Sequence, residues 1–147
     1  MIRRTTARTI ELPKEFPAII TLCGSTRFAP LFKLANMRLT KLGVLVFSIG
    51  IDTKSDADLI AAGEITEQDK QDLDDTHKRK IYISDAIMVL NAKRDPLDKE
   101  GYVGSSTESE IWYAIDQGKF VYWWYPDIIP ERFERSLGVF LERGAIA

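Results

Sequence analysis

The chain has 147 residues, of which 45% are hydrophobic and 29% are charged. This composition is typical of a globular protein and argues against a disordered or fibrous one. Lys and Arg number 20 and Asp and Glu number 22, so the net charge is −2. A protein that binds polymeric nucleic acid would carry a basic surplus, and we therefore expect no such partner.

The chain has one cysteine and one histidine. It cannot form an internal disulfide, and it is short of ligands for a thiolate-rich or histidine-based metal site. We expect no metal and no cofactor. No apolar run approaches the ~20 residues that span a bilayer, and the basic start of the chain lacks the apolar core of a secretion signal. We therefore expect a cytoplasmic protein with no membrane partner, folded as a single domain over 1–147.

Four short apolar runs lie at 18–23, 44–47, 86–90 and 120–124. None of them alternates cleanly between apolar and polar residues. Continuous apolar runs of this length are typical of strands that are buried on both faces, as in a parallel sheet. The runs therefore predict four buried strands.

The segment after the first run predicts a helix over 28–42. Its apolar residues recur at i, i+3, i+4 and i+7, which places them on one face. Pro30 falls in the first turn, where its missing N–H costs nothing. Gly43 stands where a left-handed C-cap is expected.

Further helices are predicted along the rest of the chain. A weaker helical pattern covers 66–84 and begins at Thr66, with an acidic residue three positions later. Residues 52–62 fit either a short helix or a long loop. A helix over 106–117 ends before Gly118. An apolar stripe over 130–141 predicts a last helix.

Strands and helices thus alternate along the chain. Parallel strands joined by right-handed helical crossovers predict a three-layer α/β fold with helices on both faces of the sheet. With so few strands the commonest arrangement is flavodoxin-like, with a strand order beginning 2-1-3-4.

This topology predicts where a ligand binds. In an open α/β sheet, ligands bind at the carboxyl ends of the strands beside the switch point, here between the first and third strands. The loops that leave these strands are 24–27 and 91–107. Both are polar and contain glycine, and the second is long for its kind.

The first loop reads Gly24-Ser25-Thr26-Arg27 and opens a helix. Backbone N–H groups, two hydroxyls and a guanidinium at a helix start suit a phosphate or a sugar oxygen. Alternatively, Ser25 or Thr26 only caps the helix. The loop has neither the P-loop pattern nor the dinucleotide-binding pattern.

The second loop ends in Gly101-Tyr102-Val103-Gly104-Ser105-Ser106-Thr107-Glu108-Ser109-Glu110. Two spacings in it, Thr107 to Glu110 and Ser105 to Glu108, fit capping boxes. Alternatively, Glu110 faces the crevice that the fold leaves open. A carboxylate among hydroxyl donors can act as a nucleophile at an anomeric carbon.

These residues resemble the nucleoside 2-deoxyribosyltransferase-like family, including its nucleoside-monophosphate N-glycosidases. The resemblance rests on Gly24-Ser25-Thr26-Arg27, on Ser84-Asp85-Ala86, on the segment from Gly104 to Ala114, and on Gly118-Lys119. It covers the chain up to about Tyr125.

The resemblance implies a flavodoxin-like fold in which Glu110 attacks C1′ of a 2′-deoxyribonucleoside or its 5′-monophosphate. The base leaves, and the glycosyl group passes to water or to another base. The expected partner is thus a small nucleoside or nucleotide. The residues expected to contact it are Gly24, Ser25, Thr26, Arg27, Tyr102, Gly104, Ser106 and Thr107.

The chain also departs from the family pattern. Trp112 stands where many members have glycine, Gly104 where the transferases have aspartate, and His77 where another aspartate falls. These differences favour hydrolysis over transfer between bases. They also leave the proton donor for the departing base unassigned.

Two further residues have alternative interpretations. His77, with an ordinary pKa of about 6.5, could protonate the leaving base, or it could be a buried core residue. Asp85 could orient the site, or it could close a turn before the third strand. The acidic stretch 64–75 fits a solvated helix face without metal-loop spacing.

Aromatic residues gather at Trp112 and over 123–125. A large aromatic surface suits either the core or a subunit interface, and the family is commonly oligomeric. We therefore expect a homodimer or a larger homo-oligomer. The alternative to an enzyme is a non-catalytic nucleotide-binding or sensor module, in which Glu110 only caps its helix.

Overall fold

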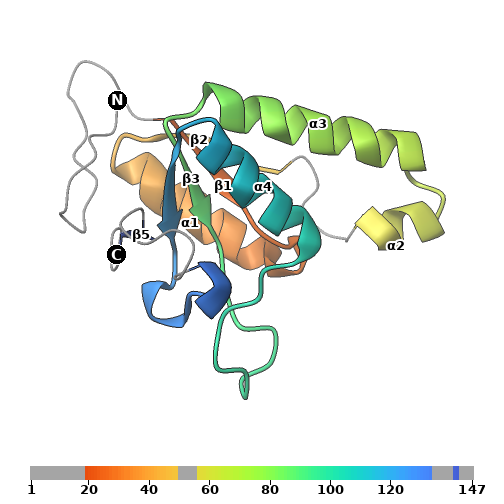
Figure 1. The fold of residues 1–147 in the computed structure, drawn as a ribbon. Helices are drawn as coiled ribbons and strands as arrows, with labels where there is room; N and C mark the ends of the chain where they lie inside the picture. The colour runs from red at the N-terminus through yellow and green to blue at the C-terminus, as the bar shows by residue number, and fades with distance from the viewer. Residues whose placement is uncertain (1–18, 50–55, 134–140, 143–147) are drawn as a thin grey trace.

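A computed structural model describes residues 19–49, 56–133 and 141–142. These residues form one five-stranded parallel sheet with helices packed against it (Figure 1). The order is β2-β1-β3-β4-β5. The 2-1-3-4 order predicted from the sequence is thereby confirmed, as is the flavodoxin-like α/β architecture. The strands are β1 (Ile19–Cys23), β2 (Leu45–Phe47), β3 (Ala86–Val89), β4 (Phe120–Trp123) and β5 (Leu141–Glu142).

The helices cover both faces of the sheet, with α1 on one face and α3 and α4 on the other (Figure 1). Among the described residues, none of these helices is both long and apolar enough to cross a bilayer. They are α1 (Ala29–Lys41), α2 (Asp56–Ala61), α3 (Glu67–Ile83) and α4 (Ser105–Asp116), with 3₁₀ turns η1 (Thr26–Phe28) and η2 (Pro126–Ile128).

Local sequence signals set several helix ends. Gly43 follows α1 with a φ of +86°, in the left-handed region that glycine enters at little cost. The α3 N-terminus carries a complete capping box. The Thr66 hydroxyl accepts from the Asp69 N–H at 3.0 Å, and the Asp69 carboxylate accepts from the Thr66 N–H at 2.9 Å. These signals were correctly predicted.

The region around 52–62 and the C-terminal tail were less well predicted. α2 forms a short helix at Asp56–Ala61, one of the two structures that the sequence allowed. The prediction of a last helix over 130–141 is wrong at its final residue. Leu141 lies in a strand, because it and Glu142 pair with Val121 and Tyr122 as β5. Residues 134–140 of that predicted helix lie outside the described residues.

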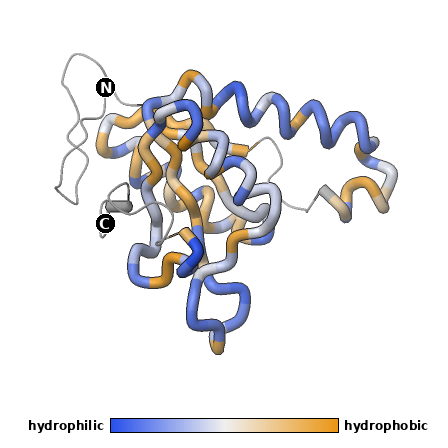
Figure 2. The backbone as a smooth tube through the Cα atoms, in the orientation of Figure 1, coloured by the Kyte–Doolittle hydropathy of each residue, from blue (hydrophilic) through white to orange (hydrophobic). Residues whose placement is uncertain are grey.

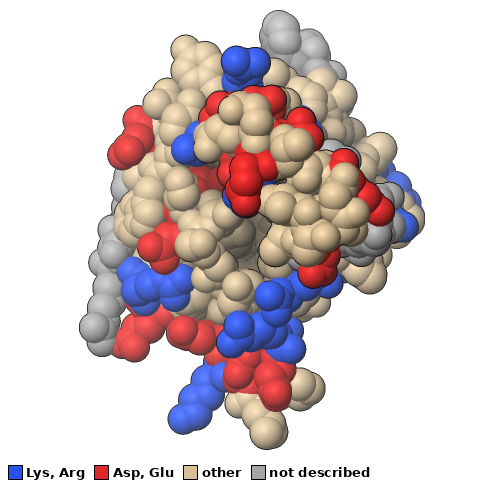
Figure 3. Space-filling view, turned by 90° about the vertical axis from the view of Figure 1, so that its right-hand side faces the viewer, with Lys and Arg blue, Asp and Glu red and all other residues tan. Residues whose placement is uncertain are grey.

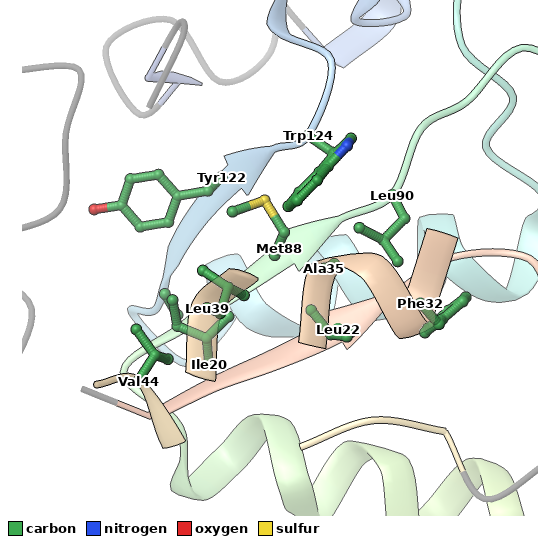
Figure 4. Close-up of a cluster of buried hydrophobic side chains, with 11 residues drawn as sticks. Ile20, Leu22, Phe32, Ala35, Leu39, Val44, Met88, Leu90, Tyr122 and Trp124 are labelled. Atoms are coloured by element: carbon green, nitrogen blue, oxygen red, sulfur yellow. The ribbon is translucent and has the colours of Figure 1, made fainter. Parts of the chain in front are cut away.

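The face of the sheet under α1 is a dry apolar core (Figure 4). Side chains from β1, β3 and β4 meet one stripe of α1 there, and Figure 2 shows the apolar strands against more polar helix surfaces. Apolar burial on this scale is a main source of stability. The buried members are Ile20, Leu22, Phe32, Ala35, Leu39, Val44, Ala86, Met88, Leu90, Tyr122 and Trp124.

The opposite face contains a second apolar cluster under α4 and the C-terminal end of α3. It also carries buried polar groups. Thr21 and Ser84 join their hydroxyls at 2.6 Å, and the Ser84 hydroxyl donates to the Lys80 carbonyl at 2.6 Å. Because side chains alternate along a strand, Ile20 and Leu22 point to the α1 face while Thr21 and Cys23 point to the α3 and α4 face.

The long loop between β3 and α4 is tied down at its base. Both amide atoms of the buried Asn91 bond the backbone of Tyr125, each at 3.0 Å. A Cβ on Gly101 would lie 2.0 Å from the Asn91 carbonyl oxygen, so only glycine fits this close backbone approach. These contacts hold the base of the loop in place, and thereby position Tyr102 and the start of α4, which come next in the chain.

Candidate functional site

A cavity of ≈ 490 Å³ opens at the carboxyl ends of β1 and β3, at the predicted switch point. Its walls come from the loop after β1, from one face of α3, and from the loop and first turns of α4. Figure 3 views the molecule from the side of α2 and shows a hollowed surface with acidic side chains above it and Lys and Arg below it. The predicted site residues that line the cavity are Gly24, Ser25, Thr26, His77, Tyr102, Gly104, Ser106, Thr107 and Glu110.

Three side chains from three elements meet beside this cavity, two of which, His77 and Glu110, line it. Cys23 is the last residue of β1, His77 lies on the buried face of α3, and Glu110 lies in the second turn of α4. The His77 Nε2 is 3.6 Å from the Cys23 Sγ and 3.5 Å from a Glu110 carboxylate oxygen. Cys23 is wholly buried, whereas the Glu110 side chain is 16% exposed and lines the cavity.

Burial keeps two members of this trio neutral. Burial, helped by the Lys80 ammonium, lowers the pKa of His77 from 6.5 to about 4, against the opposing effects of Asp74 and of a hydrogen bond with the Leu22 backbone. Burial also raises the pKa of the Cys23 thiol, and the Glu110 carboxylate adds to that effect. At pH 7 only about one His77 in a thousand is protonated. His77 is therefore poorly suited to protonating a departing base.

The start of α4 differs from the predicted capping boxes. The N-cap is Gly104, which has no side chain to bond the first turn, and Ser105 already lies inside the helix. Neither Ser105 nor Thr107 is the N-cap residue, so both capping boxes are wrong. The first-turn N–H groups of an α-helix lack intrahelical partners and favour an anion. At α4 they belong to residues that line the cavity.

The loop after β1 divides into two parts. Gly24, Ser25 and Thr26 line the cavity, and the Ser25 hydroxyl also caps η1 by accepting from the Arg27 N–H at 3.3 Å. The capping alternative for Ser25 is thus correct. Arg27 itself is exposed and lies outside the lining. Its guanidinium stands 4.7 Å from the centre of the Tyr102 ring.

Tyr102 lines the cavity but is also occupied by cations. The Arg94 guanidinium lies 4.8 Å from the ring centre, in addition to Arg27. Such contacts stabilise the ring position electrostatically. A base that packs against Tyr102 would therefore have to share the ring with these groups.

Asp85 lies far from the cavity. It precedes β3, at the amino ends of the strands, where its carboxylate accepts from the Ile19 N–H at 2.9 Å. Its own N–H donates to the Ile19 carbonyl at 2.8 Å. Asp85 thus joins the starts of β1 and β3. This agrees with its interpretation as a structural residue rather than as one that orients the site.

Sequence reasoning missed the cavity face of α3. Lys70, Asp74 and Lys80 line the cavity together with His77, and Lys70 pairs with Asp74 at 2.9 Å. Their spacing from His77 by about one or two helical turns was the available signal. Most other acidic side chains in 64–75 are exposed, as predicted.

The amino-acid composition gave no sign that different types of metal-binding side chain would come together beside the cavity. Cysteines and histidines were counted separately, whereas the structure brings one thiol, one imidazole and one carboxylate together.

The aromatic residues near the end of the sheet divide between core and surface. Trp123 and Trp124 are buried, while Trp112 is 38% exposed and Tyr125 is 40% exposed. Trp112 packs against Phe133 with ring centres 5.9 Å apart. The predicted homo-oligomer stays a prediction.

Comparisons with models of known protein families and with curated proteins found no match for this sequence. The chemistry of the cavity is therefore the basis for assigning a function. It combines a carboxylate that reaches the opening, a helix N-terminus rich in hydroxyls, and two lysines on the facing helix.

Proposed function

We propose that the chain cleaves or transfers at the N-glycosidic bond of a (deoxy)nucleoside or nucleoside 5′-monophosphate, with Glu110 as the nucleophile. The observation that carries this proposal is the position of Glu110. Its carboxylate lines a cavity at the switch point of the sheet, one helical turn from Ser106 and Thr107. A cavity of ≈ 490 Å³ falls in the size range of small-molecule sites.

The proposed reaction has two steps. A Glu110 oxygen attacks C1′ while the bond from C1′ to the base nitrogen breaks and the base leaves with the electron pair and takes up a proton. Water or a second base then attacks C1′ and releases the carboxylate. A 2′-deoxy sugar suits this route, because the missing 2′-hydroxyl no longer opposes positive charge at C1′.

A 5′-phosphate on the substrate is supported by the charges around the cavity. The first turn of α4 favours an anion through its N–H groups and helix dipole. Lys70 and Lys80 line the same cavity from α3, with the Lys70 ammonium paired to Asp74 and the Lys80 ammonium bonded to the Ser48 carbonyl. Arg27 was expected to contribute here, but its place beside Tyr102 moves this role to the lysines. We therefore favour hydrolysis of a nucleotide over transfer between nucleosides.

The test incubates the protein, in the presence of a metal chelator, with a panel of nucleosides, deoxynucleosides and their monophosphates. Chromatography then measures the release of free base. Glu110→Gln should lower kcat/KM by at least about 1,000-fold, because the amide cannot form the glycosyl ester. Glu108→Gln is the matched control. Glu108 lies on the same helix outside the cavity, paired with Arg132 at 2.8 Å, and its variant should stay within about threefold of the wild type.

Retained turnover in Glu110→Gln would refute the nucleophile assignment. So would a wild-type protein that cleaves no member of the panel.

The second candidate is a nucleotide-binding module without chemistry. It is favoured by the neutral state of His77, which makes this side chain a poor acid for the leaving base. Thermal-shift measurements separate the two functions. A module would be stabilised by nucleotides without releasing base, and Glu110→Ala would change its stability rather than any turnover.

A further inference from the structure

We infer that Cys23, His77 and Glu110 form a binding site for a divalent transition metal of the Zn²⁺ class, with the remaining coordination position open to the cavity. One ligand atom from each residue lies within 4.8 Å of the other two. Three protein ligands plus one position for water or substrate is the usual arrangement of a reactive zinc site.

Two of the three ligand separations match those around a tetrahedral ion, and the third, from Cys23 to Glu110, is at most 4.8 Å. With a Zn–S bond of about 2.3 Å and Zn–N and Zn–O bonds of about 2.0–2.2 Å, tetrahedral geometry places sulfur and nitrogen about 3.6 Å apart and nitrogen and oxygen about 3.4 Å apart. The observed separations from His77 Nε2 are 3.6 Å to Cys23 and 3.5 Å to Glu110. The second is longer than the 2.7–3.2 Å of ordinary N–H···O hydrogen bonds.

The donor types select the class of ion. Thiolate and imidazole suit Zn²⁺ and its neighbours, whereas Mg²⁺ and Ca²⁺ prefer sites built from oxygen alone. When the ion binds, the Cys23 thiol loses its proton to solvent and its sulfur forms the bond to the metal. The thiolate and the Glu110 carboxylate then offset the two positive charges of the ion.

The surroundings hold the ligands in place. Metal-bound histidines usually make a second hydrogen bond that orients the ring, and His77 has one to the backbone of Leu22. Cys23 is fixed at the end of a central strand, paired with Val89. Among the charged groups that line this cavity, Asp74 favours a cation, whereas Lys70 and Lys80 oppose it. The Lys70 ammonium pairs with Asp74 at 2.9 Å, and the Lys80 ammonium donates to the Ser48 carbonyl at 2.7 Å.

A consequence follows that rests on the proposed function. The Glu110 oxygen that is bonded to the metal is no longer available to attack C1′, and the ion draws electron density from the other oxygen, so the metal-bound form should not release base. Metal binding and Glu110 chemistry would then exclude each other, and Zn²⁺ would inhibit. The metal site itself does not depend on this consequence.

The test uses the full chain, stripped with a chelator and kept reduced. Zn²⁺ affinity is measured by competition with a chromophoric chelator, and Co²⁺ is added as a spectroscopic probe. We expect one ion per chain, a thiolate-to-cobalt absorption band in the near ultraviolet, and no binding of Mg²⁺. Cys23→Ser, His77→Gln and Glu110→Gln should each weaken Zn²⁺ binding at least about 10- to 100-fold.

Glu108→Gln is the matched control, because it removes a carboxylate from the same helix as Glu110 but outside the cavity, where it pairs with Arg132; its Zn²⁺ affinity should stay within about threefold of the wild type. Circular dichroism checks that each variant folds, and the Co²⁺ spectrum of the wild type decides the matter even if a variant does not. Absence of Zn²⁺ binding, Co²⁺ binding without the thiolate band, or an unchanged affinity in Glu110→Gln would overturn the site.

The two proposals fail separately. The metal titration needs no nucleotide, and the base-release assay is run with chelator present. If base release is found, saturating Zn²⁺ should abolish it and chelator should restore it. Full activity with the trio metal-loaded would refute the mutual exclusion and leave the metal site standing.

Discussion

The two faces of the central sheet are built from the same strands but carry different kinds of side chain. On the α1 face, Ile20 and Leu22 of β1 enter a wholly apolar cluster (Figure 4). On the other face, the alternate residues Thr21 and Cys23 meet a hydroxyl, an imidazole and, beyond it, a carboxylate. Because side chains alternate along a strand, β1 thus contributes apolar side chains to the core on one face and polar side chains next to the cavity on the other.

This difference predicts different responses to substitution. Changes on the α1 face should alter the free energy of unfolding and leave the cavity's chemistry intact. Changes to the polar groups on the α3 and α4 face should alter pH dependence and ligand binding at a smaller cost in stability, because buried polar groups contribute less net free energy than a well-packed apolar side chain.

The largest expected stability effect is on the α1 face. Leu22→Ala should lower the free energy of unfolding by about 3 kcal/mol, since Leu22 is fully buried and the change leaves a void. Urea denaturation measures this, with Leu97→Ala as the same substitution at a side chain that is 91% exposed. The folded Leu22→Ala protein should keep its Zn²⁺ affinity. A loss below about 1 kcal/mol would contradict a tightly packed α1 face.

The next effect concerns His77 in chelator-treated protein. Its folded pKa of about 4 lies below the unfolded value of 6.5, so between these values the unfolded chain binds more protons. Stability should therefore fall by roughly 3 kcal/mol as the pH is lowered from 6.5 to 4, and this contribution should be constant above and below that window.

Unfolding free energies of the wild type and His77→Gln across this range measure the contribution as a difference, which removes the shared effect of the carboxylates. If the free energy of unfolding depended on pH in the same way in both proteins, His77 would have the same pKa in the folded and unfolded chains. Its side chain would then be better solvated than its burial implies.

The smallest effect concerns the hydroxyl pair on the polar face. Thr21→Val removes the bond to Ser84 while Ser84 keeps its bond to the Lys80 carbonyl, so the loss should be about 1 kcal/mol. Thr40→Val removes an exposed hydroxyl bond to Asn36 and should change stability by less than about 0.5 kcal/mol. Equal thermal shifts in the two variants would mean that burial adds nothing to the Thr21 bond.

Much of the fold was predictable because its signals are local. The four apolar runs coincide with β1 to β4 to within one residue at each end, since parallel strands that are buried on both faces are typically apolar along their whole length. β5 was not predictable. It is two residues long and exists only through pairing with β4, a contact that no local pattern encodes.

The candidate site divides in the same way. Glu110 and the Gly24–Thr26 segment were predicted because chain topology alone brings the loops after β1 and β3 together. Asp85 was included as a candidate although it precedes β3, at the amino ends of the strands. Lys70 and Asp74 were missed because the direction in which a largely polar helix faces is set by packing.

The amino-acid sequence by itself determined the order of strands and helices, the ends of α1 and α3, and the edge of the sheet where the cavity lies. These follow from apolar periodicity, capping residues and the handedness of crossovers, all of which act over short stretches of chain. Only the tertiary structure decided that Cys23 and His77, 54 residues apart, stand 3.6 Å from each other beside Glu110. That meeting depends on how α3 and α4 pack across β1, and packing is decided by the whole molecule at once.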